Sequence, residues 1–235
     1  MKWHRFLIKE SLDSQTVRTV DKDLIHQWRS VLRFGVGDKL ILFNDSGVEV
    51  KAEFTNINNE LAELKVIEKL ERNKSNGRKV YLYLALIKQN NFELAVEKAT
   101  EVGVASITPL ITERTVKLGF RSERLEKIIK EASEQSGRTN IPSLNEPIKL
   151  AEALTLAKSD GQIVFCDPSG TNLNSILSNT SIPSITSIFI GPEGGWSQNE
   201  LTLAREHGAQ IASLGQTILR AETATIVASY WQVNL

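Results

Sequence analysis

Two glycine-bearing segments near the C-terminal end of the chain have residue types that suit ligand binding. The first is Gly191-Pro192-Glu193-Gly194-Gly195, called the first loop below, and the second is residues 214–220, called the second loop. Glycine lets another group approach the backbone closely, and ligands of open α/β sheets bind beyond the carboxyl ends of the strands. The two loops are therefore candidates for one ligand site, although a purely structural turn would use the same glycines.

The flanking residues predict that each loop follows a strand and precedes a helix. Apolar residues 185–190 lead into the first loop, and Ser197 with Glu200 forms the pattern of a capping box that begins the next helix. Residues 210–214 lead into the second loop, and a helix is expected after Arg220. Both loops then lie at strand ends.

Motif spacing argues against several other chemistries. The chain has no GxxxxGK[ST] sequence and no GxGxxG followed about 20 residues later by an acid, so ATP and NAD are poor candidates. It has no GxSxG elbow of a hydrolase. The 3 histidines lack zinc-ligand spacing and Cys166 is the single cysteine, so we expect no metal and no disulfide, and we interpret Cys166 as a buried apolar residue.

Composition is that of an ordinary globular protein. The 235 residues are 41% hydrophobic and 24% charged, and no apolar run approaches the length of a membrane span or a signal peptide, so we expect a cytoplasmic protein without membrane contact. Its 28 basic and 28 acidic side chains cancel, so any surface for nucleic acid must be local. One such surface, or alternatively a solvated helix face, is the run Arg114, Lys117, Arg121, Arg124, Lys127 and Lys130.

Hydrophobic periodicity predicts two domains, 1–72 and 73–235, with the boundary in the polar stretch 68–79. The first should be a small β-rich domain with strands at 3–8, 40–43, 48–54 and 61–67 and a helix that begins at Asp21 and ends before Gly35 and Gly37. The second should be an α/β domain with a parallel sheet, with strands at 80–87, 163–166, 185–190 and 210–214 and helices ended by Gly103 and Gly137.

Residues 190–195 together with residues 218–224 resemble the bacterial 16S ribosomal RNA uracil-N3 methyltransferases, members of the SPOUT (trefoil-knotted) superfamily. The resemblance extends along nearly the whole chain, through residues 97–103, 108–110, 131–138, His26 and Leu32-Arg33 before Gly37-Asp38. The order and spacing of these motifs make it specific.

The resemblance implies a fold and an activity. We expect a C-terminal trefoil-knotted methyltransferase domain preceded by a PUA-like barrel that helps to bind RNA, assembled as a homodimer. The expected reaction is methylation of N3 of a specific uridine in 16S rRNA, within the 30S subunit, with S-adenosylmethionine (SAM) as the cofactor and S-adenosylhomocysteine (SAH) as the product. A knotted enzyme acting on another base or on ribose 2'-OH, and a non-catalytic ribosome-assembly factor, remain alternatives.

Site residues follow from the same resemblance. The expected cofactor-binding residues are Gly191, Pro192, Glu193, Gly194, Leu214, Gly215, Ile218, Leu219, Thr223 and Ala224. The expected catalytic residues are Arg220 and Glu222. Arg220 could hold a developing uracil anion, orient RNA, bind the methionine carboxylate or pair with an acid, and Glu222, like Glu193, could accept the N3 proton, cap a helix or contact the dimer partner. The expected RNA-binding residues are Arg5, Arg33, Lys88, Arg114 and Arg138, for each of which a surface position without function is the alternative.

The sequence also departs from the family pattern. Gln216-Thr217 stands where Pro-Arg is common, Ala221 stands where threonine is usual, and Asn44-Asp45-Ser46-Gly47 replaces a shorter Asp-Gly turn. The second loop therefore lacks one arginine that could contact phosphate.

Overall fold

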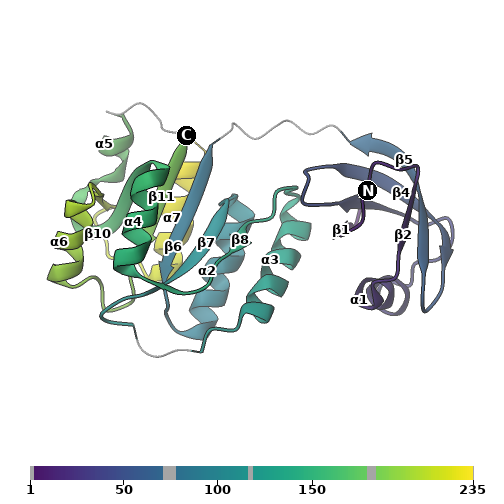
Figure 1. Ribbon diagram of the computed structural model, residues 1–235, viewed down its shortest axis with the longest axis horizontal. Helices are drawn as coiled ribbons and strands as arrows, with labels where there is room; N and C mark the ends of the chain where they lie inside the picture. Colours follow the sequence, from purple (N-terminus) through teal and green to yellow (C-terminus); the bar gives the residue numbers. More distant parts are fainter. Residues whose placement is uncertain (1–2, 71–77, 116–118, 179–183, 235) are drawn as a thin grey trace. The chain divides into compact units, whose positions relative to one another are not determined.

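The computed structural model describes residues 3–70, 78–115, 119–178 and 184–234 (Figure 1). The chain divides into two compact units, the first formed by 1–74 with 133–140 and the second by 75–132 with 141–235. The predicted boundary between residues 72 and 73 lies outside the described residues.

The first unit is built on a sheet of five strands in the order β1-β3-β4-β5-β2. Strand β1 pairs in parallel with β3, and the other pairs are antiparallel. The strands are β1 (Arg5–Leu7), β2 (Thr16–Thr19), β3 (Lys39–Phe43), β4 (Glu49–Ile57) and β5 (Ala62–Leu70), with helix α1 (Lys22–His26) and the π-helical turn η1 (Gln27–Val31).

The core of this unit surrounds one indole ring. Trp28 is fully buried and packs edge-on against Phe6 and Phe54. The Asp21 carboxylate accepts hydrogen bonds from the first turn of α1, as its position before the helix predicted. The helix was predicted to end before Gly35 and Gly37, but the helical segment already ends at Val31. The chain then turns at Arg33, whose φ is 59°.

The second unit contains an entirely parallel sheet in the order β12-β10-β11-β6-β7-β8, with β9 beside β7. Its strands are β6 (Lys79–Ala85), β7 (Ser106–Ile111), β8 (Ser143–Leu144), β9 (Ile148–Lys149), β10 (Gln162–Asn172), β11 (Ile185–Ile190) and β12 (Gln210–Ser213). Its helices are α2 (Gln89–Val102), α3 (Ser122–Ser136), α4 (Leu150–Asp160), α5 (Leu173–Ser178), α6 (Gln198–Glu206) and α7 (Ala221–Val233). The predicted α/β class with a parallel sheet is confirmed.

Helices cover both faces of this sheet, as Figure 1 shows. Alternate side chains of a strand point to opposite faces, so Ile188 and Ile190 of β11 join the core beneath α2 and α7 while Phe189 joins the core beneath α4 and α6. Continuous apolar strands are thereby buried on both sides. Because helices cover both faces, a site can form in the loops at the carboxyl ends of the central strands.

Candidate active site

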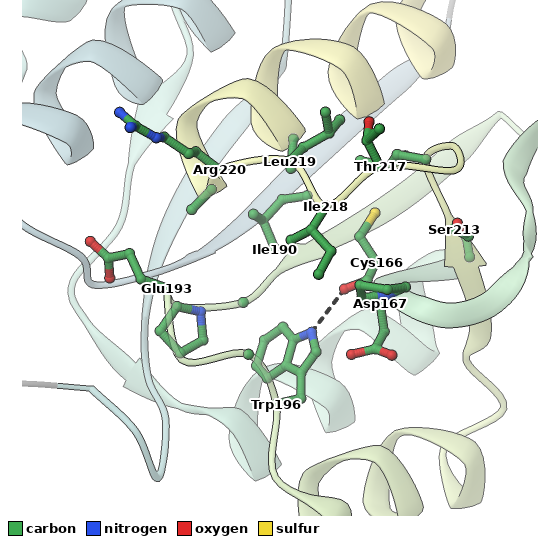
Figure 2. Close-up of a pocket in the computed structure, with 18 residues that line it drawn as sticks. Cys166, Asp167, Ile190, Glu193, Trp196, Ser213, Thr217, Ile218, Leu219 and Arg220 are labelled. Atoms are coloured by element: carbon green, nitrogen blue, oxygen red, sulfur yellow. Dashed lines mark hydrogen bonds between the residues drawn. The ribbon is translucent and has the colours of Figure 1, made fainter.

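A pocket of about 270 Å³ lies at the carboxyl ends of β10, β11 and β12, which are neighbours in the sheet (Figure 2). Its lining consists of residues 166–168, 190–193, 195–196, 212–214, 217–221 and 224. Three chain segments distant in sequence therefore meet around one space, where ligands of parallel sheets bind. Both glycine loops line this pocket. They were predicted to share a ligand site because each follows a strand of the same sheet.

Hydrogen bonds fix the first loop and the start of the helix that follows it. The Gly195 N–H donates to the Pro192 carbonyl at 2.8 Å, which closes a turn. Beyond it the predicted capping box is confirmed: the Glu200 N–H donates to Ser197 Oγ at 3.1 Å, and the Ser197 N–H donates to Glu200 Oε2 at 2.8 Å. The backbone is thus fixed next to the pocket.

The second loop is more exposed. Gly215 has a φ of +145°, a conformation that other residues rarely adopt, and Ser213 Oγ donates to its carbonyl at 2.9 Å. Ile218, which lines the pocket, is 84% exposed. After Arg220 the chain enters α7, where the Ala224 N–H donates to the Arg220 carbonyl at 2.8 Å.

The third lining segment is residues 166–168, after the regular part of β10. The family resemblance implied that the chain after Cys166 joins the two glycine loops around the cofactor, but none of these three residues was among the expected site residues. The end of the predicted strand 163–166 was the available signal, because it points to the same edge of the sheet. Asp167 Oδ1 accepts from the Ser169 N–H at 2.9 Å and from its hydroxyl at 2.6 Å. Burial raises the pKa of the Cys166 thiol to about 12, with a smaller contribution from Asp167, so this thiol is neutral at physiological pH.

Most expected cofactor residues line the pocket. Those that do are Gly191, Pro192, Glu193, Leu214, Ile218, Leu219 and Ala224; of the others, Gly194 and Gly215 belong to the same two loops and Thr223 to the first turn of α7. The residues that the sequence analysis did not select include Asp167, Pro168 and Trp196. Trp196 directly follows the first loop, and its adjacency was the only sequence signal for it.

The two expected catalytic residues differ in exposure. Arg220 is exposed and lines the pocket, and Figure 2 shows its guanidinium extending toward the side where Glu193 lies. Within the described part of the chain, Arg220 forms no ion pair with Glu193 or Glu222. Glu222 is 8% exposed, does not line the pocket, and has no hydrogen-bond partner for Oε2 among the described residues.

Two expected RNA-binding residues lie close to the first loop. Arg114 Nη1 donates to the Gly194 carbonyl, and the Lys88 N–H donates to Glu193 Oε1 at 3.4 Å. Both residues are exposed; Arg114 brings its guanidinium to the backbone of the first loop, whereas Lys88 contacts the loop through its backbone N–H.

The other three expected RNA-binding residues belong to the first unit. Arg5 forms an ion pair with Glu49 at 2.7 Å and lies over the Phe43 ring, Arg33 is exposed, and Arg138 Nε donates to the Asn140 carbonyl. Burial lowers the pKa of Arg138 to about 10. Arg33 is therefore the most accessible of these three cations.

The basic run between Arg114 and Lys130 is partly neutralised by acids. Arg124 binds the Glu93 carboxylate at 2.8 Å and Lys127 pairs with Glu131 at 4.0 Å, while Lys117 lies outside the described residues.

In the described segments no group of three or more His, Cys, Asp or Glu side chains could hold a metal ion, and no helix is long and apolar enough to cross a membrane.

Comparison with known proteins identifies the family. An RNA methyltransferase domain model matches residues 73–232, and an RNA methyltransferase PUA domain model matches residues 29–67. The chain belongs to the RNA methyltransferase family. It is 34% identical to the ribosomal RNA small subunit methyltransferase E of Rickettsia conorii over 233 residues, which cover 97% of this chain and 94% of that protein.

Further members of this methyltransferase family agree with that assignment. The Bacillus subtilis small subunit methyltransferase E is 28% identical over 234 residues, with 94% and 91% of the two chains covered. The crystal structure of the Neisseria gonorrhoeae methyltransferase E, bound to SAM, superposes with a TM-score of 0.88 at 28% identity and covers 97% of this chain and 95% of that one. The predicted PUA-type N-terminal domain and RNA methyltransferase domain are thereby confirmed.

Proposed function

We propose that this chain methylates N3 of a specific uridine in 16S rRNA. The observation that carries the proposal is the pocket formed by residues 166–168 of β10 and by the loops after β11 and β12, with one RNA methyltransferase domain spanning all three. SAM is the cofactor, and it supplies an electrophilic methyl group on a sulfonium centre. Relatives named small subunit methyltransferase E support the choice of small-subunit rRNA as substrate.

The lining fits an adenosine-containing cofactor better than a nucleoside triphosphate. Ile190, Ile218 and Leu219 provide apolar surface for a flat base, and the loop backbones provide polar groups. Among the described lining residues Arg220 is the one cation, whereas a triphosphate would require several. Arg220 is suited to hold a carboxylate or the developing uracil anion.

For the RNA, the chain must remove the imide proton and hold the base out of its stack. Two carboxylates are candidates to accept that proton: Glu222, which follows Arg220 by two residues and is the more buried, and Glu193, which lines the pocket. We assign substrate contacts to Arg5, Arg33, Lys88, Arg114 and Arg138, of which Lys88 and Arg114 belong to the unit that contains the pocket and contact the first loop. We further propose a trefoil knot around the cofactor, a homodimer and a cytoplasmic location, on the strength of the family resemblance.

The deciding experiment incubates the protein with methyl-labelled SAM and either free 16S rRNA or 30S subunits that lack the modification. Mass spectrometry of the digested RNA then identifies the modified nucleoside. We expect N3-methyluridine from the 30S subunits. Label found in ribose or in another base would show that the methylated position is not N3 of uridine. A protein that neither binds SAH nor transfers label would be a non-catalytic RNA-binding factor.

A further inference from the structure

Trp196 links two of the loops that form the pocket. It lies between the first loop and Ser197, the N-cap of α6, and its side chain is only 5% exposed although it lines the pocket. Figure 2 shows the indole on the opposite side of the pocket from the second loop. Its ring therefore forms a rigid boundary of the space assigned to the cofactor.

The indole N–H connects the end of the first loop to Cys166, where the regular part of β10 ends. Trp196 Nε1 donates to the Cys166 carbonyl at 2.9 Å (Figure 2). Cys166 is the last residue of β10 in its first register with β12, and the register shifts between Cys166 and Thr171. The hydrogen bond thus fixes the peptide where the chain leaves the regular ladder and places Asp167 and Pro168 against the pocket.

Two further contacts determine the position of the ring. Trp196 packs against Phe165, with ring centroids 4.2 Å apart and an interplanar angle of 36°. On the other side, a Cβ atom at Gly191 would lie 2.9 Å from Trp196 Cε2. The ring is held between the core and the backbone of the first loop, so glycine at position 191 is required here by close packing.

We propose that Trp196 is a positioning residue that sets the separation between residues 166–168 of β10 and the first loop, and thereby the affinity for the cofactor. This inference rests on the proposed function, because it assumes that the pocket holds SAM or SAH. The indole acts by keeping both loops in the binding conformation before the ligand arrives, which reduces the ordering cost of binding.

The first test is Trp196→Phe, which keeps an aromatic ring against Phe165 but removes the N–H donor. Isothermal titration calorimetry with SAH should show affinity weakened about fivefold, the effect of one net neutral hydrogen bond. With SAM and 30S subunits, KM for SAM should rise by a similar factor while kcat stays within twofold, since the ring does not act on the RNA base. Trp28→Phe is the matched control, because it also removes an indole N–H from a buried ring. The N–H of Trp28 has no hydrogen-bond partner among the described residues, so this change should leave SAH affinity unaltered.

A double-mutant cycle tests the steric part independently of the hydrogen bond. Gly191→Ala should weaken SAH binding about tenfold beside the intact indole and less than threefold in a Trp196→Leu background, because the smaller side chain leaves room for the new methyl group. Circular dichroism melting of each variant without ligand separates lost affinity from lost folding.

The outcomes distinguish a failure of this inference from a failure of the proposed function. If the wild-type protein binds SAH and Trp196→Phe binds it equally well with an unchanged KM, Trp196 is only a packing residue and the inference is overturned while the methyltransferase assignment stands. Equal losses from Gly191→Ala in both backgrounds would also overturn it. If the wild-type protein itself fails to bind SAH, the proposed function fails and this inference fails with it.

Discussion

The guanidinium of Arg114 donates a hydrogen bond to the backbone carbonyl of Gly194. A residue that follows β7 is thereby held against the first loop, which follows β11, two strands away in the sheet. Only part of the guanidinium is used by this contact, and the side chain remains exposed. Arg114 can therefore order the loop and present positive charge to RNA at the same time.

Arg114→Ala should weaken binding of 16S rRNA about tenfold and should reduce the slope of log affinity against log salt concentration by about one, because one phosphate contact is lost. Filter binding at several salt concentrations measures both quantities. Lys127→Ala is the control, since Lys127 is an exposed cation paired with Glu131 on α3. An unchanged salt slope for Arg114→Ala would mean that the residue supports the loop and does not contact phosphate.

Arg220→Ala should lower kcat by about 100-fold or more, because the pocket loses the cation that we propose stabilises developing negative charge. Its melting temperature should match that of the wild-type protein, since the side chain is exposed and forms no ion pair with Glu193 or Glu222 in the described part of the chain. Arg220→Lys should recover part of the activity. Methylation of 30S subunits by Arg220→Ala at a near-normal rate would remove Arg220 from the reaction.

Glu222→Gln separates a proton acceptor from a structural carboxylate. The amide has nearly the same shape, so the variant should fold. The Glu222 carboxylate is buried, and its Oε2 has no hydrogen-bond partner among the described residues, so its replacement should leave the melting temperature equal or higher. As a proton acceptor, Glu222 should be needed for kcat but not for SAH affinity. Glu193→Gln is the matched comparison, and the variant with the larger loss of kcat at constant SAH affinity identifies the base.

Local patterns predicted the elements that local forces determine. Strand β11 was expected at residues 185–190 and is observed at Ile185–Ile190, because a short apolar run beside a glycine loop has few other structures available. Helix α2 ends at Gly103, with φ of +118°, as the periodicity and the glycine indicated. The capping box at Ser197 was equally readable.

Elements without a strong local pattern were not predicted. Strand β7 contains Pro109, a residue that strands usually avoid, and β2 is short and polar. Helix α4 was missed as well. Its buried residues are apolar, but its sequence has no distinct start signal, since Lys149 provides no side-chain cap.

The same distinction applies to the site. The glycine loops were recognisable because glycine marks close approach to the backbone, but the contribution of Asp167 and Pro168 depends on β10 lying between β11 and β12. That order is a property of long-range pairing. The contact of Trp196 with the Cys166 carbonyl spans 30 residues and has no local signature.

Ser197→Ala should lower the free energy of unfolding by about 1 kcal/mol, the usual value of a helix N-cap. Glu200→Ala should cost more, because the Glu200 carboxylate accepts hydrogen bonds from the N–H groups of both Ser197 and Glu113. Urea denaturation followed by circular dichroism measures both. Thr202→Ala, an exposed position on the same helix, serves as the control.

Alkaline pH should destabilise the protein through Tyr83. Burial raises the pKa of its hydroxyl from 10.0 to about 12, with a smaller contribution from Asp160. The folded state therefore retains a proton that the unfolded state loses above pH 10, and the stabilisation present below that pH is lost progressively as the pH rises toward 12. Each unit of pKa difference corresponds to about 1.4 kcal/mol.

Tyr83→Phe tests this effect, because it keeps the ring stacked on Phe189 at a centroid distance of 4.5 Å and removes the ionisable group. Urea unfolding at pH 8, 10 and 11.5 should show a smaller decrease in the free energy of unfolding for the variant than for the wild-type protein. Cys166, whose pKa is also raised to about 12, contributes a decrease that begins near pH 9 in both proteins and so cancels in the comparison. Parallel curves for the two proteins would show that Tyr83 ionises in the folded state as readily as in the unfolded chain.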